Sequence, residues 1–234
     1  MAAEPIHKHM VCLANSRKTS GRCIAGKELL RGSAGGWLRP VSDREHEEVS
    51  EGERQYKDGT DPRVLDIIRV PLIRPRPKEY QKENWLLHPD FYWTRTGLLP
   101  WLGLRTFADR PDRLWTNGSS TVQGLNDRVH LNTARRFTES LYLIHAPCVT
   151  LRVHSPGEDY GNAKRRVQAC FEYAGEEYRL RVTDPVVERR YLAMRNGKYL
   201  LHDCYVTVSL GEPYKGYCYK LAAAIIGKDE AERT

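Results

Sequence analysis

The stretches Arg166-Val-Gln-Ala-Cys-Phe-Glu-Tyr173 and Glu177-Tyr-Arg-Leu-Arg-Val182, separated by Ala174-Gly175, decide the fold class of this chain. In both stretches the apolar residues recur at every second position, which is the period of a β-strand. A short connection that contains glycine between two such stretches is typical of a β-hairpin. The sequence therefore predicts two antiparallel strands that share one apolar face.

Similar short strands are expected along the whole chain. Asp203–Leu210 and Tyr217–Ile226 predict a second long hairpin. Arg63–Ile73 predicts the strongest strand of the first half, because it is rich in β-branched residues. Further strands are expected at His9–Leu13, Arg22–Gly26, Gly35–Ser42, Leu141–Ile144 and Cys148–His154.

The segments between these strands contain little regular helix. Residues 184–200 favour a short helix that begins after Asp184-Pro185 and is stopped by Asn196-Gly197. Residues 89–120 are interpreted as an irregular connector, and residues 121–139 fit either a helix or a mixed loop. We therefore predict a mainly β chain of two small OB-like β-barrels, one in residues 1–120 with the connector and one in residues 121–234. Two SH3-like barrels or one larger mixed sheet would give a similar list of strands.

The composition is that of a folded protein. Hydrophobic residues make up 40% of the 234 residues, which is enough to bury a core. The longest apolar run, Leu221–Ile226, is far shorter than the roughly 20 residues of a membrane-spanning helix. Residues 1–9 contain no apolar stretch of the kind found in a secretory signal. We expect a cytoplasmic protein without membrane association, with reduced cysteines and no metal site.

Positive charge is unevenly divided along the chain. Residues 1–138 hold 23 Lys and Arg against 17 Asp and Glu, whereas residues 139–234 hold 14 against 13. Six basic residues lie within residues 63–82, while residues 43–53 form an acidic patch that is interpreted as a solvated loop. A basic excess of this kind indicates a polyanion, such as nucleic acid, as a partner.

A first group of candidate binding residues lies between the first two predicted strands. Asn15, Ser16, Arg17 and Lys18 fall in a predicted turn, where an OB barrel presents its first binding loop. The two basic side chains suit phosphates, and the two polar ones suit fixing the register of a strand. The alternative is an ordinary polar turn in which Asn15 accepts a left-handed conformation and Ser16 bonds its own backbone.

A second group combines an aromatic ring with cations on neighbouring strands. Trp37 and Arg39 are two residues apart and point to the same side, and Arg22 is expected beside them. An aromatic ring next to a guanidinium is typical of a surface on which single-stranded bases stack. Alternatively, Trp37 belongs to the core, and Arg39 pairs with a carboxylate such as Asp66.

Two smaller groups complete the candidates for nucleic-acid binding. Gln81, Asn84 and Trp85 suit the reading and stacking of a base, or else Trp85 closes the barrel while Asn84 caps a turn. In the last hairpin, Tyr219 and Lys220 point to opposite faces, and both are candidate contacts. If the tyrosine faces inward, it belongs to the core instead.

Several short blocks of the sequence resemble a known family. These blocks are Cys12–Lys18, Gly21–Gly26, Gly36–Ser42, Leu65–Arg69, Gln81–Trp85, Val206–Pro213 and Tyr217–Ile226. They span most of the chain and make it similar to the prokaryotic dual-OB domain family, whose members carry two OB barrels. The resemblance implies a nucleic-acid-binding module that is often part of bacterial defence against phage. It implies no catalytic residue.

We therefore expect a non-enzymatic protein that binds single-stranded or structured DNA or RNA without a cofactor. It would act as a recognition or adaptor component of bacterial defence, together with a protein effector encoded nearby. One alternative is an enzyme with an unrecognised site among Arg128, His130, Arg135 and Arg136, although the chain has no P-loop, HExxH or GxSxG motif. Another is a protein–protein adaptor that docks through the final hairpin.

Overall fold

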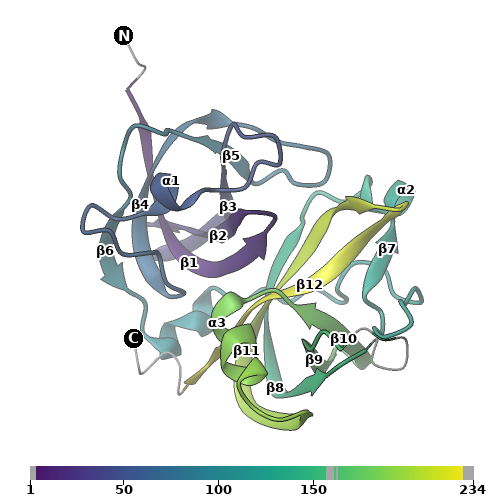
Figure 1. Ribbon diagram of the computed structural model, residues 1–234. Coiled ribbons are helices and arrows are strands. Elements are labelled where there is room, and N and C mark those ends of the chain that lie inside the picture. The colour runs from purple at the N-terminus through teal and green to yellow at the C-terminus, as the bar shows by residue number, and fades with distance from the viewer. Residues whose placement is uncertain (1–3, 157–160, 162, 229–234) are drawn as a thin grey trace. The chain divides into compact units, whose positions relative to one another are not determined.

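The computed structural model describes residues 4–156, 161 and 163–228, and it divides the chain into two compact units, Met1–Phe107 and Ala108–Thr234 (Figure 1). In each unit, most of the described residues with regular structure belong to β-strands. The strands of each unit are wound into a small barrel with short helices between them. This confirms the predicted fold class.

In the first unit, five strands pair in a closed circle, as in a small β-barrel. Its elements are β1 (Ile6–Lys18), β2 (Gly21–Leu30), β3 (Ser33–Val41), α1 (Glu51–Arg54), β4 (Asp66–Pro75), β5 (Asn84–Leu87), β6 (Thr94–Leu98) and the 3-10 helix η1 (Trp101–Thr106). The pairing runs β1–β2–β3–β5–β4 and returns to β1, and within this circle β3 and β5 are parallel. The sixth strand, β6, pairs with the first half of β4.

The second unit repeats this strand order. Its elements are β7 (Arg128–His130), α2 (Leu131–Ala134), β8 (Leu141–His154), β9 (Arg166–Tyr173), β10 (Glu176–Val182), α3 (Pro185–Leu192), β11 (Gly197–Tyr214) and β12 (Tyr217–Gly227). The pairing runs β8–β9–β10–β12–β11 and returns to β8, with β10 and β12 parallel. In both units, a helix follows the third strand of the circle.

The hairpin of residues 166–182 forms as predicted. In its antiparallel register Phe171 lies opposite Tyr178, and both side chains are buried. Ala174 and Gly175 have φ values of 51° and 77°. Positive φ at both positions produces the two-residue turn whose twist matches that of the strands it joins.

The core of the first unit is formed by inward-facing residues of its strands and by three residues of the connecting loops. These residues are Met10, Cys12, Ile24, Leu38, Val49, Tyr56, Ile68, Val70, Leu72, Leu87 and Trp93. Gly26 marks a close approach of β1 and β2, because a Cβ atom there would lie 2.0 Å from the carbonyl oxygen of Val11. Glycine at this position permits the close approach, next to the register shift between Cys12 and Ala14 of β1.

The helical segments are shorter than predicted. Helix α3 begins at Pro185, where the Asp184 carboxylate accepts hydrogen bonds from two backbone N–H groups of the first turn. It ends at Leu192, before the predicted end, because the chain from Gly197 onward pairs with β8. Residues 121–139 take the mixed form, with β7 followed by the single turn of α2.

The division between the units falls after Phe107, whereas the sequence predicts it after residue 120. Residues 108–120 belong to the second unit through contacts such as that of Asp109 with Leu143. The backbone N–H of Asp109 donates to the Leu143 carbonyl oxygen at 2.6 Å, and the Leu143 N–H donates to Asp109 Oδ2 at 2.8 Å.

Candidate nucleic-acid interface

The structure corrects the predicted position of Asn15, Ser16, Arg17 and Lys18. These residues continue β1 and pair with β2, so that the turn is reduced to residues 19–20. Arg17 is exposed and Lys18 is half-buried. The backbone pairing extends further than the turn-forming composition of this segment indicates.

Asn15 and Ser16 hydrogen-bond to the backbone of their own barrel. Asn15 Nδ2 donates to the carbonyl oxygen of Pro62 at 2.8 Å, and Ser16 Oγ donates to that of Cys23 at 3.3 Å. Asn15 is not among the residues with positive φ, and both side chains bond to the backbone of distant residues, so these contacts also differ from the alternative of a polar turn.

Trp37 and Arg39 lie on the face of β3 opposite to the core residue Leu38. Trp37 is half-buried, and the Nζ atom of Lys27 lies 5.5 Å from its ring centroid. Arg39 is only 3% exposed, and its Nη2 atom lies 2.9 Å from Glu83 Oε1. The aromatic–cation pair of this face is therefore Trp37 with Lys27.

Two residues expected near Arg39 contact other residues in the structure. Arg22 lies in β2 opposite Arg17, at the far end of that strand from the Lys27 position. The carboxylate of Asp66 lies 2.7 Å from Arg95 Nε and does not pair with Arg39.

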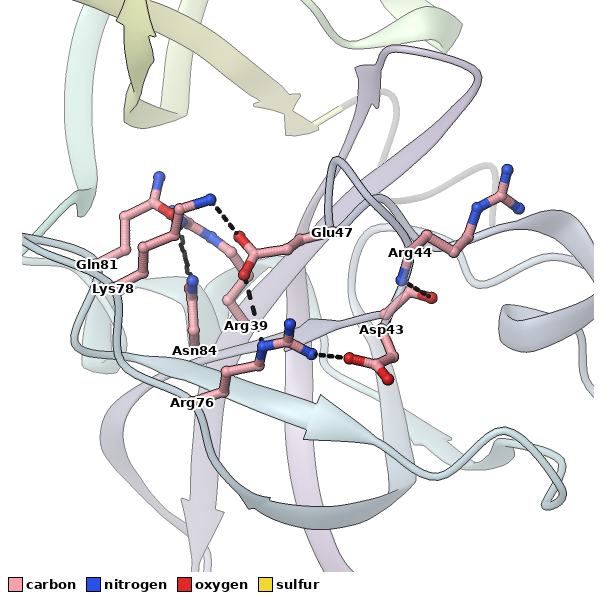
Figure 2. A network of polar contacts seen from close by, with 9 residues as sticks. Arg39, Asp43, Arg44, Glu47, Arg76, Lys78, Gln81 and Asn84 are labelled. Atoms are coloured by element: carbon pink, nitrogen blue, oxygen red, sulfur yellow. Dashed lines mark hydrogen bonds and ion pairs between the residues drawn. The ribbon is translucent and has the colours of Figure 1, made fainter.

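Gln81, Asn84 and Trp85 are packed into the first barrel. Asn84 Nδ2 donates to Gln81 Oε1 at 3.3 Å, and Arg39 Nη1 donates to Asn84 Oδ1 at 3.4 Å (Figure 2). Trp85 packs against the core, with the Nζ atom of Lys8 4.6 Å from its ring centroid. The polar residues thus form a buried network behind the surface.

Part of the basic segment of the first unit is neutralised by the acidic segment of residues 43–53. Arg76 Nη1 lies 2.5 Å from Asp43 Oδ1, and Lys78 Nζ lies 2.9 Å from Glu47 Oε2. Figure 2 shows Glu47 between Lys78 and Arg76. Because Glu47 is buried, the prediction of a wholly solvated acidic loop is wrong at this residue.

A run of cations crosses the outer surface of the second barrel. The strand register places Lys198 of β11 opposite Arg152 of β8, Arg152 opposite Gln168 of β9, and Gln168 opposite Arg181 of β10. Arg179 is two residues from Arg181 and shares its side of β10. Arg152, Arg179 and Arg181 alternate with buried apolar residues and Lys198 is exposed, so these side chains face outward, while Gln168 on the same side of the sheet is buried. We name this surface the basic face; its cations are Arg152, Arg166, Arg179, Arg181 and Lys198.

Part of the basic face is hollowed into a cavity of about 370 Å³, which we name the cationic pocket. It is lined by Thr150, Arg152, Cys170, Arg179 and Lys198, with no carboxylate among these residues. Burial raises the pKa of the Cys170 thiol, and Arg179, Arg152 and Lys198 act in the opposite direction. The cations are therefore close enough to one another to repel.

A second cavity, of about 670 Å³, adjoins the basic face, and we name it the loop pocket. Its lining residues are Thr121, Gln123, Asp127, His154, Pro156, Lys164, Arg166, Gln168, Arg181, Gly211, Glu212, Tyr214, Tyr219, Lys220 and Leu221. Burial lowers the pKa of His154, and the neighbouring Arg152 lowers it further. This pocket combines cations with polar and aromatic groups.

Tyr219 lies at the rim of the loop pocket together with Tyr214. The two ring centroids are 6.3 Å apart, and Tyr214 is 60% exposed. The Nζ atom of Lys215 lies 5.4 Å from the Tyr214 ring centroid. Aromatic rings in this setting can stack with nucleobases.

Lys220 points into the barrel and is 1% exposed. Its Nζ atom donates to the Thr116 carbonyl oxygen at 2.8 Å and to Asn117 Oδ1 at 2.9 Å, and it lies 5.1 Å from the Tyr178 ring centroid. Burial lowers the pKa of Lys220 to about 7, although Asp127 opposes this effect. The ammonium group thus bonds to the interior of the barrel in this structure.

Two residues of the alternative enzyme site, His130 and Arg128, make contacts that stabilise their own segment. His130 caps α2, with Nδ1 accepting from the backbone N–H of Asn132 at 3.4 Å. The guanidinium of Arg128 lies 4.2 Å from the Tyr217 ring centroid. Within the described part of the chain, no group of three or more His, Cys, Asp and Glu residues is placed to hold a metal ion.

The sequence analysis missed the basic face, although a signal for it is present. Thr150-Leu-Arg152 and Arg179-Leu-Arg181 alternate polar and apolar residues, so strand periodicity already places the arginines on the outer surface. The count of charges hides them, because residues 139–234 hold 14 basic residues against 13 acidic ones. Two of the carboxylates, Glu172 and Glu177, lie opposite each other beside the hairpin turn, and Glu177 is two residues from Arg179 on the same side of β10.

Comparison with known proteins identifies the family but no individual relative. Among the described residues, no helix has the length and apolarity needed to cross a membrane. No curated protein and no solved structure matches the chain. The family described as dual OB-containing domain matches residues 8–225, a span that takes in nearly all of both strand circles. With two five-stranded circles of one order and a helix after each third strand, the chain belongs to the family of dual OB-containing domains.

Proposed function

We propose that the second barrel binds single-stranded nucleic acid across the basic face and the adjoining loop pocket. OB barrels generally bind oligonucleotides or oligosaccharides on their second and third strands and the neighbouring loops. In this barrel those strands are β9, which carries Arg166, and β10, which carries Arg179 and Arg181. A face rich in cations suits a phosphate chain better than a neutral sugar.

The observation that carries this proposal is the cross-strand pair of Lys198 and Arg152. Like charges directly opposite each other destabilise a sheet. Here the cavity beside them adds Arg179 and contains no lining carboxylate that would offset the repulsion. A bound polyanion would remove this repulsion, and that gain would contribute to its affinity.

The tyrosines and the first barrel extend the proposed contacts. Tyr214 and Tyr219 would stack with bases, each stacked base contributing about 1–3 kcal/mol to binding. In the first barrel, Arg17, Lys18, Arg22 and Trp37 stay proposed contacts. The buried and half-buried candidates would support the surface from inside; they are Asn15, Ser16, Arg39, Gln81, Asn84, Trp85 and Lys220.

The family resemblance extends the proposal to the biological role. We propose that the bound strand is presented to a protein effector, as in a recognition component of bacterial defence. Co-purification with the products of adjacent genes, with and without added single strands, tests this role. Nucleic-acid binding without any co-purifying neighbour would overturn the adaptor role alone.

Fluorescence anisotropy with labelled single-stranded DNA and RNA at several salt concentrations tests the binding itself. The double variant Arg152→Ala, Arg179→Ala should lower affinity about tenfold or more, because a hydrogen bond to a charged group contributes about 1.5 kcal/mol or more. It should also make the slope of log K against log salt shallower by about 1.4, since each phosphate contact on a single strand contributes about 0.7.

The variant Arg189→Ala is the matched control. Arg189 is exposed on α3 of the same unit and lines neither pocket, yet its loss removes the same charge. If this control weakens binding as much as the loss of Arg179 alone, the basic face is not the binding surface.

A further inference from the structure

The cationic pocket concentrates more positive charge than a passing phosphate backbone requires. Arg152, Arg179 and Lys198 converge on one cavity of about 370 Å³, with Thr150 and Cys170 as its other lining residues. A phosphodiester carries a single negative charge, so a strand that crosses a surface needs about one cation for each phosphate. Three cations around one cavity match an anion of higher charge.

A terminal phosphate group has this higher charge. A phosphomonoester carries a charge of about −1.5 to −2 near pH 7 and has three strong acceptor oxygens. The two guanidinium groups can each donate a pair of hydrogen bonds, and the Lys198 ammonium adds a point charge. The Thr150 hydroxyl supplies a further donor.

The charges around Cys170, one of the lining residues of the cationic pocket, also favour a bound anion. Arg179, Arg152 and Lys198 all act on the Cys170 thiol, and each of them favours its anionic form. The strand register explains this convergence. Cys170 lies directly opposite Thr150 on one side and Arg179 on the other, while Lys198 faces Arg152 at the next position along β8. A group seated over Cys170 therefore meets all three cations.

We infer that the cationic pocket binds the terminal phosphomonoester of a nucleic-acid strand. The second barrel then recognises a phosphorylated strand end and not only a length of backbone. This inference rests on the proposed function and deepens it, because it names the part of the strand that is recognised.

The neighbouring surface provides a path for the following nucleotides. Gln168 lies directly across from Arg152 and lines the loop pocket, where Tyr219 stands at the rim. The volume of the cationic pocket is at the lower end of the range for small-ligand sites, which suits one end group. The bases that follow would then reach the loop pocket.

Three labelled single strands of one sequence test the inference by anisotropy. One has a 5′-phosphate, one has a 3′-phosphate, and one has hydroxyl groups at both ends. We expect one of the phosphorylated strands to bind about tenfold more tightly than the hydroxyl-ended strand, because it adds charge-assisted hydrogen bonds. Equal affinity for all three strands overturns this inference and leaves the proposed function intact, whereas no binding of any strand overturns both.

The variants Lys198→Gln and Arg179→Gln should bring the ratio of phosphorylated to hydroxyl-ended affinity close to one. Lys198 is exposed, so its replacement does not disturb the core, and a thermal melt confirms the fold. The control Arg189→Gln should keep the tenfold ratio. A ratio that stays near ten in both pocket variants overturns the assignment to this pocket.

Competition with a nucleoside 5′-monophosphate and with inorganic phosphate separates a strand end from a free phosphate. The strand makes the additional contacts along the basic face, so each competitor should be needed at roughly a hundredfold higher concentration than the unlabelled phosphorylated strand. Displacement by either competitor at an equal concentration would assign the pocket to a small phosphate ligand and overturn the recognition of strand ends.

Discussion

At the scale of single residues, the buried side chains of Arg39 and Lys220 have different kinds of partner. The Arg39 guanidinium lies 2.9 Å from the Glu83 carboxylate, in a pair withdrawn from solvent. Lys220 has no such partner at its Nζ atom, which donates to the neutral oxygens of Thr116 and Asn117. A neutral amine still has two N–H donors, so both hydrogen bonds survive the loss of the proton.

The low pKa of Lys220 predicts a pH-dependent stability. Its pKa is about 7 in the folded chain and 10.5 in an unfolded one. Between these pH values the unfolded chain binds the extra proton, so the free energy of unfolding should rise with pH from about 7 to about 10. The rise should reach a few kcal/mol, at about 1.4 kcal/mol for each unit of pKa difference.

Urea unfolding of the native protein and of Lys220→Met from pH 6.5 to 9.5 measures this effect. The difference between the two proteins should shift in favour of the native one as the pH rises. A difference that is constant across this range would contradict the neutral form of Lys220.

The pair of Arg39 with Glu83 predicts that Arg39 contributes to the free energy of unfolding of the first unit. Arg39→Met leaves the buried Glu83 carboxylate without its partner and should lower the free energy of unfolding by about 3–5 kcal/mol. The double variant Arg39→Met, Glu83→Gln should lose less than the sum of the single variants, because no unpaired charge is buried. Additive losses in a urea double-mutant cycle would show that the two side chains are not coupled.

At the scale of elements, the register between paired strands decides which of the outward-facing residues become neighbours on one surface. Strand periodicity decides that Arg152 faces outward, but only the pairing of β8 with β11 places Lys198 opposite it. The same pairing decides the end of α3, because residues from Gly197 onward take part in it. Asn15 and Ser16 show the reverse case, since a turn-forming composition is overridden by the pairing of β1 with β2.

Because Lys198 and Arg152 lie opposite each other, we expect Arg152, a proposed binding residue, to lower the free energy of unfolding of the protein without ligand. Arg152→Gln should raise the free energy of unfolding by about 0.2–1 kcal/mol in a buffer without phosphate, because it removes a like-charge cross-strand pair. The effect should shrink at high salt, since added ions screen the repulsion. A lowered urea midpoint at low salt would mean that Arg152 stabilises the sheet by another contact.

At the scale of the whole molecule, the charges are distributed differently from their order in the sequence. The first half has the larger basic excess, yet Arg76 and Lys78 of its basic segment pair with Asp43 and Glu47. The second half is nearly balanced in number, yet its outer face gathers cations that line a pocket without a carboxylate. Net charge by segment is therefore a poor guide to where a polyanion binds.

The two units also share one strand order without any close sequence repeat. This is possible because the order of strands depends on backbone pairing and on the position of apolar residues, which many sequences satisfy. The predicted division after residue 120 relied on the interpretation of residues 89–120 as an irregular connector of the first barrel. The contacts of Asp109 with β8 instead join residues 108–120 to the second unit.

The amino-acid sequence by itself determined the mainly β class, the hairpin of residues 166–182 with its inward side chains, and the start of α3. Each depends on neighbours within a few positions, namely the alternation of apolar residues, a two-residue turn and a capping aspartate. Only the tertiary structure decided which cations remain on a common surface and which are paired or buried. The pairs Arg39–Glu83, Lys78–Glu47 and Lys198–Arg152 are each separated by tens of residues, and only the folding of the strands and their connecting loops brings them together.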